Sequence, residues 1–317
     1  MSPSWISRWL KGSSGPKASI GIAIGRREVC AVHAVLGDKG AHIQAIDTAQ
    51  LSDAMFAGPP TPAAESNLAA AFVKVAKVAK GRFIPCHVAL PDPAIMFTVF
   101  ELDDLPKSEK TRLELVRWRF AKEYSADAET FDCVHQALGQ ENGKHLLLGQ
   151  EIDKAWWQCI KQALRSAGIT PWSMNLGACY RFNQFYDRFA KEKQGAAMII
   201  LDPDSWAVFL WDAAARPRLA RARWRTSTDA AMEDYDAIAL EAERSILSYV
   251  RAGKEGSVSR VYAISHAREL EGLTTALDRR LREKCLPLIM PSMDPEGDRR
   301  IMDHGLASVS LAAATAA

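Results

Sequence analysis

The first part of the chain alternates apolar and polar positions in a way typical of short strands. Residues 18–34 form an apolar-rich run that breaks at 25–28 (Gly-Arg-Arg-Glu), which predicts a β-hairpin. Residues 42–48 continue the alternation as a third strand, and residues 66–80 place apolar side chains at helical spacing. The predicted order is therefore three strands followed by a helix.

The same order returns after residue 195. Residues 196–201 and 205–211 are apolar runs on either side of the turn sequence Asp-Pro-Asp at 202–204, which predicts a second hairpin. A third strand is predicted over 218–225 and a long helix over 228–251. Because three strands and a helix occur twice, we predict an α/β chain made of two duplicated halves.

The remaining elements lie between and after these two series. The other predicted strands are 86–90, 95–102, 131–138, 145–150 and 258–265. The other predicted helices are 107–122, 152–167, 176–191, 270–284 and 305–317. Three of these strands and one helix fall within about 93–150, which predicts a small inserted α+β subdomain. The predicted division is an N-terminal segment at 1–16, a first half at 17–194 and a second half at 195–317.

The N-terminal segment has its own amphipathic pattern. Four apolar residues share one face of a predicted helix, two cations lie beside them, and a Gly/Ser linker follows. The four are Trp5, Ile6, Trp9 and Leu10. We interpret the segment as a short interfacial helix that contacts a membrane; a helix packed on the body, or a frayed terminus, is the alternative.

The composition of the chain mainly excludes classes of protein and kinds of site. The 317 residues are 48% hydrophobic and 25% charged, which is the balance of a folded protein with sizeable cores. The net charge of +2 gives no sign of a dedicated polyanion binder, so nucleic acid is not an expected partner. Six scattered cysteines form no zinc motif and are expected to be reduced. Neither a membrane span nor a signal peptide is recognisable, so a cytoplasmic location is expected.

Five arginines between 216 and 225 form the densest cationic run. Ala222 and Trp224 alternate with the last three, so we expect the solvated face of an edge strand rather than a surface for nucleic acid or lipid headgroups. Acidic neighbours such as Glu233 and Asp234 would pair with it. The arginines are Arg216, Arg218, Arg221, Arg223 and Arg225.

Four motifs then fall in a recognisable order. They are GIAIG at 21–25, LDPDS at 201–205, LEAERSILSYVRA at 240–252 and VYAISHARELEGL at 261–273. In this order the chain resembles the PilM and MshI family, the actin-like cytoplasmic proteins of type IV pilus assembly. The resemblance covers about residues 20–311, includes the insert with its Phe131-Asp132 pair, and extends to the N-terminal segment. It implies an actin-like, ribonuclease H-like duplicated α/β fold with an inserted subdomain.

The resemblance also implies a nucleotide cleft, and the sequence departs from the family there. In the first motif the position of the metal-organising Asp is Ala23, although Gly25 is kept. In the second motif Asp202 remains, but Pro203 removes an N–H group and Asp204 stands where the family has a glycine. An anion at this position repels phosphate, so we expect a degenerate cleft.

The strand that would lie beneath adenine departs as well. Ser265 and His266 replace the family's Gly-Gly pair, so side chains occupy the room left for the ring. No P-loop, HExxH, GxSxG or CxxC motif offers another chemistry, and His33 and His42 lack a third metal ligand. We therefore expect no catalytic residue, no metal site and no cofactor, with ATP conceivable but not expected.

The resemblance implies a function for such a chain. We expect a non-catalytic scaffold or adaptor of a type IV pilus or related inner-membrane assembly platform, which binds the cytoplasmic tail of a PilN-like membrane protein. The alternative is an active actin-like ATPase or kinase with an atypical nucleotide site. A homo-oligomer is compatible with either. The expected partner groove lies beside the insert at Leu113, Val116 and Phe120, whose i, i+3, i+7 spacing is also that of an ordinary core.

Overall fold

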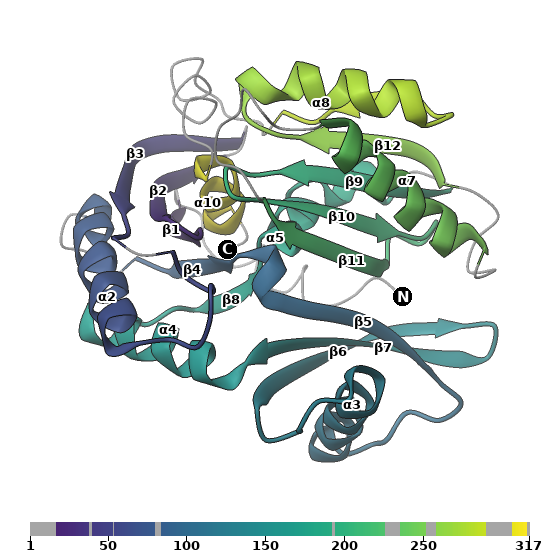
Figure 1. Ribbon diagram of the computed structural model, residues 1–317, viewed down its shortest axis with the longest axis horizontal. Coiled ribbons are helices and arrows are strands. Elements are labelled where there is room, and N and C mark those ends of the chain that lie inside the picture. Colours follow the sequence, from purple (N-terminus) through teal and green to yellow (C-terminus); the bar gives the residue numbers. More distant parts are fainter. Residues whose placement is uncertain are drawn as a thin grey trace.

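The computed structural model describes residues 17–37, 40–52, 54–79, 84–191, 194–225, 235–251, 258–289 and 306–315. Within these residues, two five-stranded sheets lie side by side and a smaller three-stranded sheet lies below them (Figure 1). No helix in these ranges is both long and apolar enough to cross a bilayer. Segment 1–16, with the predicted contacts of Trp5, Ile6, Trp9 and Leu10, lies outside the described residues, as do Glu233 and Asp234.

The first sheet has the strand order β3-β2-β1-β4-β8. β1, β2 and β3 form an antiparallel meander, while β4 and β8 run parallel to β1. Alternation along β1 sends Ile20, Ile22 and Ile24 to one face and Ala23 to the other. The strands are β1 (Lys17–Ile24), β2 (Glu28–Gly37), β3 (Gly40–Gln50), β4 (Cys86–Leu90) and β8 (Ser173–Leu176).

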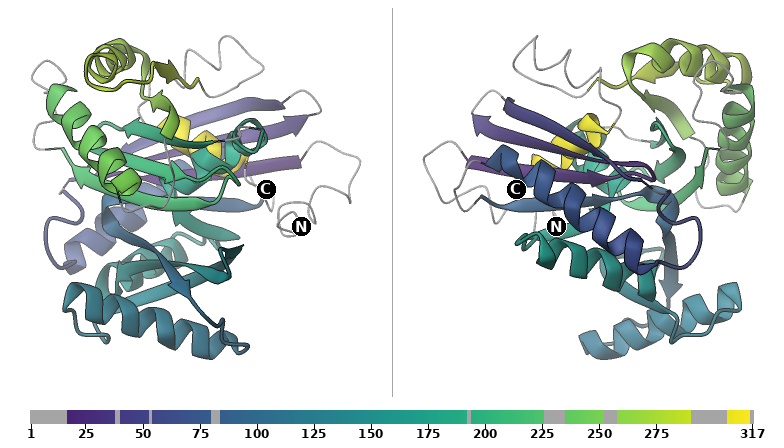
Figure 2. Two further views of the ribbon diagram at one scale, coloured as in Figure 1. Left: turned by 90° about the vertical axis from the view of Figure 1, so that its right-hand side faces the viewer. Right: turned by 60° about the vertical axis from the view of Figure 1, so that its left-hand side comes forward.

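Two helices cover the isoleucine face of this sheet. α2 (Pro62–Ala76) begins where the Thr61 hydroxyl accepts a hydrogen bond from the Ala64 N–H, with proline in the first helical position. α4 (Lys154–Ser166) is capped in the same way by Asp153. The second view of Figure 2 shows both helices on the outer side of the sheet. Apolar burial against this face forms one of the four cores.

The second sheet repeats the topology with the order β11-β10-β9-β12-β13. Its first three strands are antiparallel, and β12 and β13 run parallel to β9. α7 (Tyr235–Arg251) and α8 (Ala267–Arg280) cover its outer face (Figure 2). The predicted duplication is therefore present in the sheets. The strands are β9 (Gly195–Leu201), β10 (Ser205–Trp211), β11 (Pro217–Trp224), β12 (Val258–Ile264) and β13 (Cys285–Pro287).

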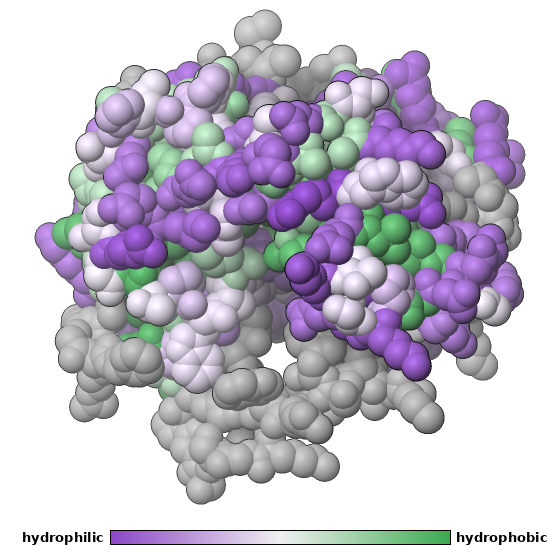
Figure 3. All heavy atoms as spheres, turned by 90° about the horizontal axis from the view of Figure 1, so that it is seen from below, coloured by the Kyte–Doolittle hydropathy of each residue, from purple (hydrophilic) through white to green (hydrophobic). Residues whose placement is uncertain are grey.

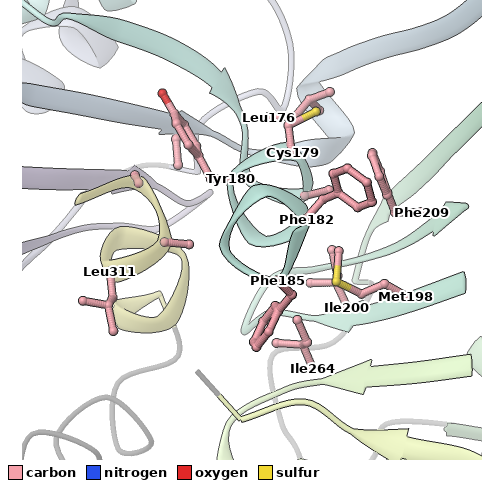
Figure 4. Packing of buried hydrophobic residues seen from close by; sticks show 14 of the residues in the cluster. Leu176, Cys179, Tyr180, Phe182, Phe185, Met198, Ile200, Phe209, Ile264 and Leu311 are labelled. Atoms are coloured by element: carbon pink, nitrogen blue, oxygen red, sulfur yellow. The ribbon is translucent and has the colours of Figure 1, made fainter. Parts of the chain in front are cut away.

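A central layer joins the two sheets. It consists of α5 (Gly177–Gln184), α6 (Tyr186–Phe189) and α10 (Ala307–Ala314), and its core contains residues from both sheets (Figure 4). α10 packs directly on β1, because Gly21 has no side chain to keep the helix away. A Cβ atom at this position would lie 1.7 Å from the Ser310 carbonyl oxygen. The last described helix thus packs on the first sheet.

The insert is a separate small layer. β5 (Ile95–Leu102), β6 (Phe131–Glu141) and β7 (Lys144–Asp153) pair in the order β5-β7-β6, and α3 (Glu109–Tyr124) covers one face. Val116 and Phe120 are fully buried in this core, and Leu113 is half-buried against it. The prediction that these three residues line a partner groove is wrong, because they hold α3 on its own sheet.

The element boundaries differ from the sequence prediction in a few places. The helix predicted over 176–191 breaks at Phe185, where a new helix begins, so α5 and α6 are separate. The strands β8 and β13 were not predicted. They have four and three residues, which are too few to show an alternation of apolar and polar positions. They also pair with strands that are distant in the sequence.

Candidate functional site

The turns of the two duplicated hairpins meet between the sheets. The first turn joins β1 to β2 and is closed by a hydrogen bond from the Gly25 N–H to the Glu28 carbonyl, 2.8 Å. The second turn joins β9 to β10 and is closed in the same way, from the Asp202 N–H to the Ser205 carbonyl, 2.8 Å. We refer to these two turns and the side chains that contact them as the turn interface.

The carboxylate of Asp204 in the second turn binds the backbone of the first turn. Its Oδ2 accepts a hydrogen bond from the Arg26 N–H, and the Arg27 N–H adds a further interaction of the same kind. Gly25 allows this approach, since a Cβ atom there would lie 2.9 Å from Asp204 Oδ2 and 2.7 Å from Leu306 Cδ1. Burial raises the pKa of Asp204 to about 6, and the backbone N–H of Arg26 opposes the rise.

The other carboxylate of the second turn is bound by a buried arginine. Arg181 of α5 is fully buried and donates to both oxygens of Asp202, at 2.5 and 3.0 Å. Asp92 also interacts with the Arg181 charge, and its Oδ1 accepts a hydrogen bond from the Ala178 N–H at the start of α5, 2.9 Å. Burial raises the pKa of Asp92 to about 7, although the Arg181 charge opposes this. One cation therefore serves two buried carboxyl groups from different halves.

A second buried arginine follows the end of β11. Arg225 donates to Glu269 of α8 at 2.8 Å and to the Asp202 carbonyl at 3.0 Å. His266 lies 2.7 Å from the other oxygen of Glu269. Burial raises the pKa of Glu269, but the hydrogen bonds from His266 and Arg225 outweigh it, so the pKa is lowered. The prediction that Arg225 is solvated is therefore wrong.

The two residues predicted beneath adenine, Ser265 and His266, lie between β12 and α8. Ser265 directly follows β12 and is 8% exposed, and no group in the described ranges forms a hydrogen bond with its hydroxyl. His266 turns to Glu269 and is the N-cap residue of α8, without a side-chain capping hydrogen bond. Both side chains thus belong to the packing of the second half.

Arg216 and Arg218 depart from the predicted solvated face as well. Both bind Asp212 and Glu141, with Arg216 at 2.7 Å from a carboxylate oxygen of each. Glu141 ends β6, so these ion pairs attach the tip of the insert hairpin to the second half. Within the arginine run, Arg221 and Arg223 are exposed as predicted.

Aromatic side chains join the halves beside the turns. The Arg26 guanidinium lies over the Trp224 ring, 5.6 Å from its centroid, and Phe56 stacks on the same ring at 5.6 Å. Phe56 adopts a left-handed φ of 61° that is unusual for a bulky residue. Its ring also contacts Trp156 at 4.6 Å. Trp224 therefore lies between two groups of the first half.

The groups at the predicted nucleotide positions contact other parts of the chain. Ala23, at the metal-organising position, lies in the apolar central core. The N–H group of Arg26 already has an anionic acceptor, and Asp202 is bound by Arg181. Among the described residues, no three His, Cys, Asp or Glu side chains are placed to hold a metal ion. The polar groups of the turn interface instead bind one another.

The insert exposes apolar side chains that sequence reasoning missed. Trp118 and Tyr124 of α3 and Val134 of β6 are 52%, 41% and 59% exposed. Trp118 has Arg119 and Lys122 beside its ring. Seen from this side, hydrophobic groups lie among hydrophilic ones (Figure 3). Trp118 lies two residues from both Val116 and Phe120, which places it on the side of the helix away from the core. The helical spacing of the apolar residues in α3 could therefore have indicated that Trp118 is exposed.

No family model matches the chain, and no curated protein matches it. Comparison with solved structures does give matches. A chain of a PilM-PilN type IV pilus biogenesis complex matches with a TM-score of 0.70 and 18% identity, over 94% of this chain and 97% of that one. A Bacteroides thetaiotaomicron protein with an actin-like ATPase fold and unknown function has a TM-score of 0.55 and 9% identity, over 92% and 96% of the two chains.

The ethanolamine utilization protein EutJ from Carboxydothermus hydrogenoformans matches with a TM-score of 0.51 and 9% identity, over 96% of this chain and 92% of that one. Identities this low show the fold alone. The predicted α/β, actin-like fold is confirmed, and the resemblance to PilM is confirmed at the level of the fold.

Proposed function

We propose that this protein is a non-catalytic scaffold of a type IV pilus or related inner-membrane assembly platform. The observation that carries the proposal is the full-length likeness of its fold to a chain of the PilM-PilN complex. In this proposal the protein lies in the cytoplasm at the inner membrane and has no nucleic-acid partner. Segment 1–16 adds a peripheral membrane contact.

The chemistry of the turn interface supports the non-catalytic part. Hydrolysis of a nucleotide needs free backbone donors for phosphate and carboxylates that hold a metal ion. Here the N–H of Arg26 donates to Asp204, and both oxygens of Asp202 accept from Arg181. The Arg26 N–H and the Asp202 carboxylate are therefore already satisfied by other groups of the chain.

The partner in this proposal is the cytoplasmic tail of a PilN-like membrane protein, and the insert offers it a strand edge. β6 is the outer strand of the order β5-β7-β6, so an extended peptide can add backbone hydrogen bonds along it. Val134 on β6 is the most exposed large apolar side chain of the insert. An apolar residue of the tail would pack there.

Two measurements test the proposal. ATP with Mg²⁺ should leave the melting temperature unchanged, because a ligand bound only by the native state would raise it. A rise in melting temperature together with turnover would favour the alternative, an atypical ATPase. A peptide with the sequence of a neighbouring PilN-like tail should bind with micromolar affinity, roughly −8 kcal/mol.

The binding measurement has a matched control. Val134→Asp should abolish peptide binding, whereas Val73→Asp, at a 49% exposed position of α2, should leave it unchanged. Hydrogen exchange of the complex should show protection within 93–150. Protection confined to the residues around Asp202 and Ser265 would contradict the β6 site, and no binding at all would contradict the adaptor role.

A further inference from the structure

The first turn has the chemistry of an anion site. Consecutive backbone N–H groups that point to one place carry partial positive charge and bind anions without any cationic side chain. The N–H groups of Arg26 and Arg27 are directed in this way at one carboxylate, that of Asp204. The acceptor belongs to the other half of the same chain.

Both sides of this contact are fixed by the fold. On the donor side, the Gly25 to Glu28 hydrogen bond closes the turn, and the absence of a side chain at Gly25 leaves room for the carboxylate. On the acceptor side, the Arg225 N–H donates to the Asp204 carbonyl at 2.9 Å, which fixes the backbone of that residue. Asp204 is 7% exposed, so water has little access to its carboxylate.

The surrounding charges do not explain the contact. Asp202 from the second half and Glu28 from the first both repel the Asp204 carboxylate. The nearby guanidinium of Arg26 lies over the Trp224 ring, and that of Arg225 pairs with Glu269. The backbone donors of the first turn are therefore the groups that favour the ionised carboxylate at this position.

We infer that the Asp204 carboxylate is a built-in anion that occupies the N–H site of the first turn and links the two halves without an added ligand. The inference goes beyond the proposed function, because it concerns the internal linkage of the fold and holds whatever the partner is. The carboxylate excludes external anions from this site as long as it is in place.

The test compares the full chain with Asp204→Ala and uses inorganic phosphate as the probe. Amide hydrogen exchange in segment 24–29 should be about tenfold faster in the variant, because its donors lose their acceptor. Millimolar phosphate should slow that exchange again and raise the melting temperature of the variant. The natural protein should respond to phosphate in neither measurement.

Three controls make the outcome specific. Asp187→Asn removes an exposed carboxylate outside the turn interface, so its exchange and its lack of phosphate response should match the natural protein. Potassium chloride at equal ionic strength should not replace phosphate. If Asp204→Ala does not fold, Asp204→Asn keeps the shape with a neutral oxygen and should show an intermediate exchange rate.

Two results would overturn the inference. Unchanged exchange in segment 24–29 of the variant would mean that the carboxylate does not hold the turn. Faster exchange that phosphate does not reverse would mean that the turn has no anion site.

Discussion

The two hairpin turns occupy equivalent places in a duplicated fold, yet they carry opposite chemistry. The first presents backbone N–H groups at Arg26 and Arg27, and the second presents the carboxylates of Asp202 and Asp204. Both are closed by the same type of backbone hydrogen bond at the same distance. The difference lies in the carboxylate side chains of the second turn and in Pro203, which has no backbone N–H. A fold that brings two turns face to face can therefore hold a ligand between them or let the turns bind each other.

The comparison also shows what replaces a ligand. Each carboxylate of the second turn has a donor of its own, a backbone N–H for Asp204 and the buried Arg181 for Asp202. Buried charges are tolerated only when they are paired and hydrogen-bonded. The turn interface meets this condition with groups from both halves.

Arg181→Ala is expected to have the largest effect on stability. It leaves Asp202 and Asp92 buried without their shared cation, so the free energy of unfolding should fall by about 3–5 kcal/mol. Urea unfolding followed by circular dichroism measures the loss. Arg188→Ala is the control, because this arginine is exposed, lies over the Tyr262 ring and should contribute about 1 kcal/mol or less. Equal losses in the two variants would contradict the role of the buried pair.

The next effect is a pH dependence at Asp92. Burial raises the pKa of Asp92 from 3.8 to about 7, so the fold binds this proton more tightly than the unfolded chain does. The resulting stability is fully present below pH about 4 and is lost as the pH rises through about 7. Asp92→Asn keeps an oxygen for the Ala178 N–H and removes this loss, on the order of 4 kcal/mol before screening.

Unfolding measured between pH 4 and pH 8 checks this prediction. The free energy of unfolding should fall less steeply with pH in Asp92→Asn than in the natural protein. Some slope should remain, because burial also raises the pKa values of Asp204 and Glu151. Asp187→Asn, at an exposed position, should keep the full slope. An unaltered slope in Asp92→Asn would contradict the assignment.

A smaller loss of stability is expected from a substitution in the first turn. Gly25→Ala places a methyl group 2.7 Å from Leu306 Cδ1 and 2.9 Å from Asp204 Oδ2, so the turns must move apart. We expect a loss of about 1–3 kcal/mol in the free energy of unfolding. Gly58→Ala has open space around the new methyl group and should be nearly neutral. A tolerated Gly25→Ala would show that the close approach of the carboxylate is not required.

The smallest effect on stability is expected on the insert surface. Val134→Asp should change the free energy of unfolding by less than about 0.5 kcal/mol, because the side chain is 59% exposed. Val116→Ala, in the same subdomain but fully buried, should cost several times more. Thermal unfolding of both variants compares them. Similar losses would mean that Val134 packs in the core.

Much of the fold could be predicted from periodicity, but the turn interface could not. The hairpin at 25–28, the helix over 107–122 and the duplicated order all follow from local patterns. The partners of Asp204, Arg181 and Arg225 lie 21 to 178 positions away, where no local pattern relates them. From the sequence, Asp204 could be seen as an obstacle to phosphate, but not as the acceptor that takes its place.

The packing of α10 on β1 has a consequence for synthesis. The space over Gly21 is filled by Ser310, whose hydroxyl donates to the Cys30 carbonyl, so the N-terminal sheet is completed by residues almost 300 positions later. A nascent chain that has not yet released residues 306–314 from the ribosome lacks the helix that packs on β1 and β2 on this face of the sheet. The first sheet therefore lacks this part of its packing until residues 306–314 have been synthesised, and chaperones would have to protect it during that period.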